Sequence, residues 1–132
     1  MPHHFSFVSH WQHAPLAHWV HLPDSSGGFK PPAPEPIPHR GYALLHVACG
    51  AHELVFSSPA QLNHCIEVLA RQPLPTTRQL SAQRGSGAGP NGHWLSRLPA
   101  VLKAPRQRAR LVEALRAVHA AVVVDGRFRI EA

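Results

Sequence analysis

The sequence predicts an α+β fold, in which a small antiparallel sheet packs against two or three helices and a His/Pro-rich N-terminal arm precedes them. Two patterns carry this prediction. A β-hairpin pattern over about residues 42–57 leads directly into an amphipathic helix, and a second amphipathic helix over about 105–119 leads into a further hairpin pattern. The chain has 132 residues, 44% of them hydrophobic. This length supports one hydrophobic core, so we expect one folded domain.

The composition of residues 1–40 differs from that of the remaining chain. Six histidines precede Pro23, and prolines recur at nearly every second position over 31–38. Proline removes a backbone donor and favours polyproline II, so the proline-rich segment is expected to be a stiff, extended linker. We therefore predict an arm and linker over 1–40, whose order the sequence leaves open, and a basic α+β core domain over 41–132. The alternation in 5–8 leaves open an edge strand within the arm.

The first half of the core has strong local signals. The apolar runs 42–49 and 53–57 flank a Gly-Ala turn and predict the hairpin. Ser58, Pro59 and Gln61 then occupy the N-cap, N1 and N3 positions of a helix. This helix is expected to end at about residue 72, because a proline follows. Its apolar stripe has helical spacing and consists of Leu62, Cys65, Ile66 and Leu69.

The second half of the core contains shorter segments with helix or strand signals. In chain order they are a capped short helix over about 76–84, a Gly-rich loop over 85–92, a short helix over about 93–98, a longer helix over about 105–119 and a hairpin over 122–130. The inward stripe expected for the longer helix is Leu111, Val112, Leu115 and Val118. The last strand either pairs within its own hairpin or joins the first two strands, and the sequence leaves this choice open.

Basic residues dominate the stretch between Glu67 and Glu113, which contains no acidic residue. The net charge is +6, and eleven of the thirteen basic residues are arginines. Like charges repel unless counter-charges lie among them, so an uncompensated basic surface favours an anionic partner. The basic residues of this stretch are Arg71, Arg78, Arg84, Arg97, Lys103, Arg106, Arg108 and Arg110.

We expect this surface to bind nucleic acid, DNA or RNA, without catalysing a reaction. The glycines of 85–92 allow a backbone to approach phosphate closely, and Trp94 either stacks on a base or anchors the loop in the core. The main alternative is a protein-interaction or inhibitor module that docks on an acidic protein, and a solvated arginine-rich face without a ligand also fits. The expected nucleic-acid or anion-binding residues are Arg78, Arg84, Trp94, Arg97, Lys103, Arg106, Arg108 and Arg110.

A short near-repeat, His-Trp-x-His, occurs twice in the N-terminal arm. Histidines three residues apart in a helical turn face the same side and can bind one metal ion. His10, His13, His18 and His21 are therefore candidate ligands for zinc, nickel or copper. Apart from such a metal ion, with zinc foremost, the sequence suggests no cofactor. A compositional histidine tract, or a pair of anchoring tryptophans, also explains the repeat.

Several classes of protein are not expected. The sequence has no paired carboxylates, nucleophile elbow or phosphate-binding loop motif, so we expect neither an enzyme nor a small-molecule substrate. No apolar run has membrane-spanning length, and the N-terminus lacks the features of a secretory signal. Cys49 and Cys65 lie in apolar patterns and are expected to be buried, reduced thiols. Together these features predict a cytoplasmic protein.

Overall fold

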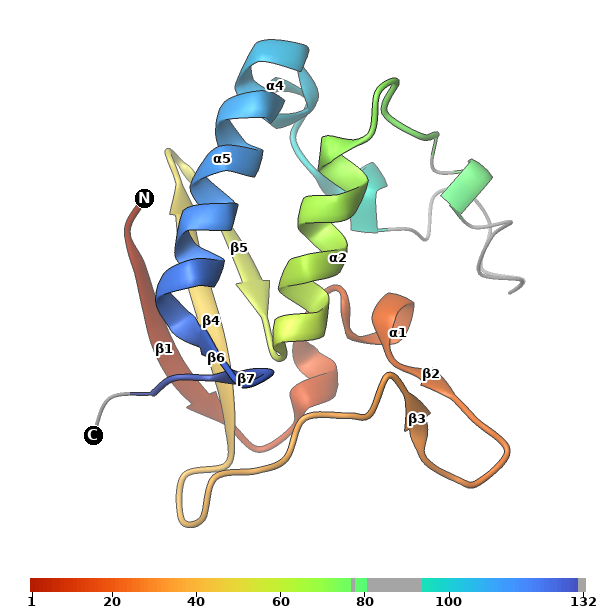
Figure 1. Cartoon of the computed structure of the whole chain (residues 1–132), viewed down its shortest axis with the longest axis vertical. Helices are drawn as coiled ribbons and strands as arrows, with labels where there is room; N and C mark the ends of the chain where they lie inside the picture. Colours follow the sequence, from red (N-terminus) through yellow and green to blue (C-terminus); the bar gives the residue numbers. More distant parts are fainter. Residues whose placement is uncertain (77, 81–93, 131–132) are drawn as a thin grey trace.

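A three-stranded antiparallel sheet lies at the centre of the computed structural model (Figure 1). The central strand β4 (Tyr42–Cys49) pairs with β1 (His3–Val8) on one side and with β5 (His52–Phe56) on the other. The predicted hairpin is therefore confirmed, and the alternating segment 5–8 belongs to an edge strand. The structure describes residues 1–76, 78–80 and 94–130.

Two helices, α2 (Pro59–Ala70) and α5 (Pro105–Val122), cover one face of this sheet (Figure 1). Side chains alternate along a strand, and Leu45 and Val47 of β4 are fully buried in the core that the helices share with the sheet. The inward stripes predicted for both helices are buried as well. Burying a large apolar side chain contributes about 1.5–3 kcal/mol to folding. The predicted α+β architecture is thus confirmed.

The start of α2 has the predicted cap, with one difference. The Ser58 Oγ accepts a hydrogen bond from the Gln61 backbone N–H at 3.2 Å, and Pro59 lies in the first turn. In a capping box, the Gln61 side chain would return to the N-cap residue. Here it bonds Ser57 instead: Oε1 accepts from the Ser57 N–H at 2.9 Å, and Nε2 donates to the Ser57 hydroxyl at 2.7 Å. The buried amide is therefore satisfied, and it holds the connection between β5 and α2.

The N-terminal segment is integrated into the fold. After β1 come a 3-10 turn, η1 (Trp11–His13), and one turn of α-helix, α1 (Ala17–Val20). Trp11 packs on Leu44 in a second apolar cluster, on the side of β4 opposite Leu45. The sequence left the order of this segment open, and the structure shows that it supplies an edge strand and a small core. A two-stranded ladder follows, formed by β2 (Leu22–Pro23) and β3 (Phe29–Lys30).

Short elements complete the described chain on either side of α5. They are η3 (Trp94–Arg97), α4 (Ala100–Lys103), β6 (Val123–Val124) and β7 (Arg127–Phe128). Among the described strands, β7 pairs with β6 and not with the central sheet, so the separate hairpin is the alternative that forms. Phe128 still packs edge-on against Phe5 of β1, with ring centroids 5.4 Å apart. The Gly-rich loop 85–92 lies outside the described residues.

Both cysteines are buried and free, as predicted. Burial raises the pKa of the Cys49 and Cys65 thiols, because a thiolate loses its hydration in the apolar core. We therefore assign both thiols a packing role, since the reactive form of cysteine is the thiolate. Across the part of the chain that the structure describes, no helix combines the length and the apolar character that crossing a membrane requires.

Replacing Gly41 by alanine is expected to destabilise the fold by about 2 kcal/mol. Gly41 has φ +89°, and a Cβ built there would lie 2.5 Å from the Val8 carbonyl oxygen at the end of β1. Gly50→Ala is the matched control, because Gly50 also has a positive φ (+64°) but a Cβ at this position would have no neighbour within 4 Å. Urea unfolding of both variants should show the larger loss for Gly41→Ala. Equal losses of unfolding free energy would mean that the positive φ, and not the contact with the Val8 carbonyl, causes the destabilisation.

Candidate nucleic-acid interface

At one end of the helical layer α2 ends, α4 lies and α5 begins (Figure 1). Basic residues lie at the end of α2, in η3, in α4 and in the first two turns of α5. We call this surface the basic end. The Lys103 Nζ, in α4, donates to the Leu95 carbonyl at 3.3 Å and ties α4 to η3. The basic end consists of Arg71, Arg97, Lys103, Arg106 and Arg110.

The arginines of the basic end are not held in ion pairs among the described residues. All four are exposed, and no ion pair between residues that the structure describes involves an arginine. The two long helices, α2 and α5, contain one acidic residue each, Glu67 and Glu113. Exposed like charges at one end of a molecule produce a positive potential there, and this potential attracts anions.

The first turn of α5 adds backbone donors to these side chains. Ala104 is the N-cap residue and supplies no side-chain cap, and the first turn contains no acidic residue. The first N–H groups of a helix lack partners within the helix, and the helix dipole is positive at this end. Arg106, in this first turn, therefore lies where an acidic side chain would stabilise the helix. A bound anion would relieve that repulsion and accept hydrogen bonds from the free N–H groups.

Arg108 does not belong to the basic end. Its side chain is only 8% exposed and lies on the same stripe of α5 as the buried Leu111 and Val112. Residues three and four positions apart share one face of a helix, so Arg108 faces the core. This corrects the expectation that Arg108 contacts an external anion. Arg106 and Arg110, two positions away on either side, are exposed.

Trp94 is buried as well. It is 5% exposed, and its indole Nε1–H donates to the Nε2 of His64 on α2 at 3.1 Å. To accept this bond, His64 must be neutral with its proton on Nδ1. Burial, assisted by the positive charge of Arg71, lowers the pKa of His64 from 6.5 to about 4. Of the two alternatives for Trp94, the structure supports the core anchor and corrects the expectation of stacking on a base.

Arg78 and Arg84 are the two remaining arginines of the predicted binding set. Arg78 is exposed in a helical turn over 78–80. This turn has the predicted capping box, because the Gln79 N–H donates to the Thr76 hydroxyl at 3.1 Å and the Thr76 N–H donates to the Gln79 Oε1 at 2.9 Å. Arg84 lies outside the described residues, so its role in binding stays a prediction.

The four histidines of the near-repeat do not converge on one point. The rings of His10 and His13 have centroids 5.4 Å apart, His18 is exposed, and His21 is buried with both ring nitrogens in hydrogen bonds. Although all four are described, they form no group in which three ligand atoms lie within 4.8 Å of one another. In this arrangement the four side chains are not gathered into one site, and zinc binding at these positions stays a prediction.

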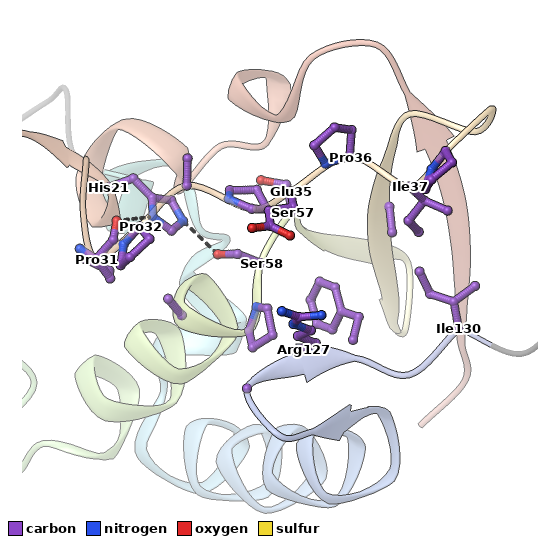
Figure 2. Close-up of a pocket in the computed structure, with 18 residues that line it drawn as sticks. His21, Pro31, Pro32, Glu35, Pro36, Ile37, Ser57, Ser58, Arg127 and Ile130 are labelled. Atoms are coloured by element: carbon purple, nitrogen blue, oxygen red, sulfur yellow. Dashed lines mark hydrogen bonds between the residues drawn. The ribbon is translucent and has the colours of Figure 1, made fainter. Parts of the chain in front are cut away.

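His21 instead makes a contact that sequence reasoning missed (Figure 2). Its Nδ1–H donates to the Pro31 carbonyl at 3.0 Å, so its Nε2 accepts from the Ser58 hydroxyl at 2.7 Å. The two side chains are 2% and 4% exposed. The helix cap at Ser58 was visible in the sequence, but nothing in the sequence indicated its partner 37 residues away.

The contact between His21 and Ser58 lies in the wall of a cavity of about 630 Å³, which segment 31–38 and β7 also line (Figure 2). A serine hydroxyl bonded to a histidine nitrogen is also the arrangement of a nucleophile and its base. Here the hydroxyl already accepts the Gln61 N–H of α2 while it donates to His21. We therefore assign the pair as a clamp that holds the N-terminal segment on α2.

The fold and the basic end together define a small basic α+β protein with exposed arginines on its helical layer. Comparison with protein-family models, with curated proteins and with solved structures found no match. Function must therefore be inferred from the residues of the chain itself.

Proposed function

We propose that the protein is a small, non-enzymatic binding protein that contacts nucleic acid, DNA or RNA, through the basic end. One observation carries this proposal: exposed arginines that form no ion pair among the described residues lie at the end of α2, in η3 and in the first two turns of α5, an 18-residue helix that has no side-chain cap. Guanidinium groups bind phosphate oxygens through paired hydrogen bonds, and the N–H groups at a helix start add donors. A nucleic acid presents many phosphates in sequence, which suits several arginines distributed over α2, η3 and α5.

The positions of the arginines favour contact with the backbone rather than with bases. Arg106 and Arg110 are one helical turn apart, about 6 Å along α5, so both can reach the phosphates of one strand. Trp94 is buried and unable to stack on a base. Phosphate contacts set the position of a protein on nucleic acid but do not distinguish sequences. We therefore expect binding through the described residues to show a steep salt dependence and little sequence preference.

A cytoplasmic location is part of the proposal. The two free, buried cysteines support it, because disulfides are rare in reducing compartments. An acidic protein that docks on the same arginines is the second candidate, and the uncompensated charge favours it in the same way. Competition against a labelled oligonucleotide separates the two candidates. If nucleic acid is the partner, unlabelled generic DNA or RNA should displace the labelled oligonucleotide, and an acidic protein should displace it poorly.

Replacing Arg106 and Arg110 together by glutamine is expected to weaken nucleic-acid binding about 10-fold and to reduce the salt slope by about one unit for each lost phosphate contact. The measurement is fluorescence anisotropy with labelled single- and double-stranded DNA and RNA, at about 50 mM and about 150 mM salt. Arg127→Gln with Arg129→Gln is the matched control, since it removes the same charge from exposed positions on and next to β7.

The control decides between local contact and general charge. A larger loss for the Arg106/Arg110 variant supports the basic end as the interface. Equal losses for the two double variants would show that net charge, and not this surface, governs binding. Binding that neither variant changes, or that vanishes for the unmodified protein near physiological salt, would contradict the proposal.

A further inference from the structure

A second group of polar side chains lies on the central sheet, outside the basic end. His4 on β1, His46 on β4 and Glu53 on β5 come from three adjacent strands. His4 and His46 are direct partners in the strand register, and Glu53 pairs with Ala48, which follows His46 on the same face of β4. Because this face is opposite to that of the buried Leu45 and Val47, the group is open to solvent: His4 and Glu53 are exposed and His46 is partly exposed.

The ligand atoms of the three residues converge. One nitrogen of each histidine and one carboxylate oxygen all lie within 4.8 Å of one another. The His46 Nδ1 is 2.9 Å from the Glu53 Oε1, and the two imidazole rings stack with centroids 4.5 Å apart and an angle of 4° between their planes. Among the described residues, no other set of three histidine, cysteine or acidic side chains is this close.

A fourth residue holds the central histidine in place. The His46 Nε2 lies 2.6 Å from the Ser6 hydroxyl of β1. Because the Glu53 carboxylate accepts at Nδ1, the Nδ1–H donates to it and Nε2 is held by the Ser6 hydroxyl. A metal ion would take the place of the Nδ1 proton, and the bond to Ser6 keeps the ring in its orientation. Ser6 therefore leaves Nδ1 directed toward Glu53. Paired strands are also a more rigid support for ligands than a loop is.

We infer that His4, His46 and Glu53 form a binding site for a divalent transition-metal ion, with zinc as the ion that suits it best. Two imidazole nitrogens and one carboxylate oxygen are ligands that zinc accepts, and three protein ligands leave a fourth position for water. The ligands come from the edge strand β1 and from both strands of the hairpin, so a bound ion would fasten the edge strand to the rest of the sheet.

Isothermal titration calorimetry of the untagged 132-residue chain with zinc chloride tests this site directly. We expect saturable binding of one ion, weakened about 10-fold or more by His4→Gln and by Glu53→Gln, since even an outer partner of a metal ligand is worth 10–100-fold. Both residues are exposed, so their substitution leaves the core intact. The matched control replaces His10 and His13 by glutamine, which also removes exposed histidines, and should retain wild-type affinity.

Thermal unfolding supplies a second readout. Saturating zinc should raise the melting temperature of the wild-type protein and of the His10/His13 control, but not that of His4→Gln or Glu53→Gln. Absence of saturable binding, or an equal affinity in the His4 and Glu53 variants and the wild type, would overturn the inference. Loss of binding only in the His10/His13 variant would assign zinc to the N-terminal histidines instead.

Discussion

Lowering the pH from 6.5 to 4 is expected to cost the fold about 3 kcal/mol through His64 alone. Burial and the nearby charge of Arg71 lower the pKa of His64 from 6.5 to about 4 in the folded protein. Between these values the unfolded chain binds a proton at His64 that the folded chain does not. Protons therefore favour unfolding in this range, and the loss of stability is complete below about pH 4.

The structural reason is the bond between α2 and η3. The His64 Nε2 accepts the Trp94 indole N–H at 3.1 Å. A proton on Nε2 would remove this acceptor and place a charge in a buried position. The same contact holds Trp94 in the core, and Trp94 belongs to η3, the same turn that contains Arg97 of the basic end. Binding assays are therefore best performed above pH 6.5, where His64 is neutral in both states.

His64→Asn isolates this effect, because asparagine keeps an acceptor for the indole N–H and does not titrate. In urea unfolding across the acid range, the wild type should show the steeper loss of stability and should lose about 3 kcal/mol more than the variant does as the pH falls from 6.5 to 4. His52→Asn, which removes an exposed histidine at the start of β5, should leave the wild-type pH dependence in place. Parallel curves for wild type and His64→Asn would contradict the assignment.

His21→Ala is expected to destabilise the protein by about 3 kcal/mol. The substitution removes two hydrogen bonds and leaves the buried Ser58 hydroxyl without its acceptor. It also opens space beside Trp11, whose ring meets the His21 ring edge-on at 5.2 Å between centroids. Because His21 joins the N-terminal segment to α2, we expect limited proteolysis to become faster in residues 22–40 of the variant.

A double-mutant cycle tests whether His21 and Ser58 act as one unit. Ser58→Ala alone removes the helix cap as well, which costs about 1 kcal/mol. If the two residues act as one unit, the double variant should lose about 1–2 kcal/mol less unfolding free energy than the sum of the losses for His21→Ala and Ser58→Ala. Additive losses would show that the two residues stabilise the protein separately. His13→Ala, at an exposed position in the preceding turn, is expected to have little effect.

Local sequence patterns were sufficient for the elements of the core. The hairpin, the capped start of α2 and the inward stripe of α5 all depend on residues within a few positions of one another. For Arg108 the prediction was wrong although the helical spacing of the sequence indicates its burial. The prediction considered charge alone and placed Arg108 with Arg106 and Arg110, whereas helical periodicity places it on the apolar stripe with Leu111.

The contacts that define the sites depend on the whole chain. The composition of residues 1–40 suggested a separate arm, whereas Trp11 and the clamp hold this segment on the sheet and on α2. Trp94 lies next to a Gly-rich stretch, and the sequence left open whether its ring stacks on a base or anchors in the core; a bond to His64, 30 residues earlier, places it in the core. A tryptophan in that context fits either environment until the packing partner is known.

The sequence by itself determined the secondary structure of the core, its apolar stripes and the excess of basic charge, because these properties arise from neighbouring residues and from composition. The tertiary structure decided which residues meet: His21 with Ser58, Trp94 with His64, and His4 with His46 and Glu53. It also decided which arginines reach solvent. Such contacts join positions tens of residues apart, and they depend on strand register and on how the helices pack on the sheet, neither of which a local pattern specifies.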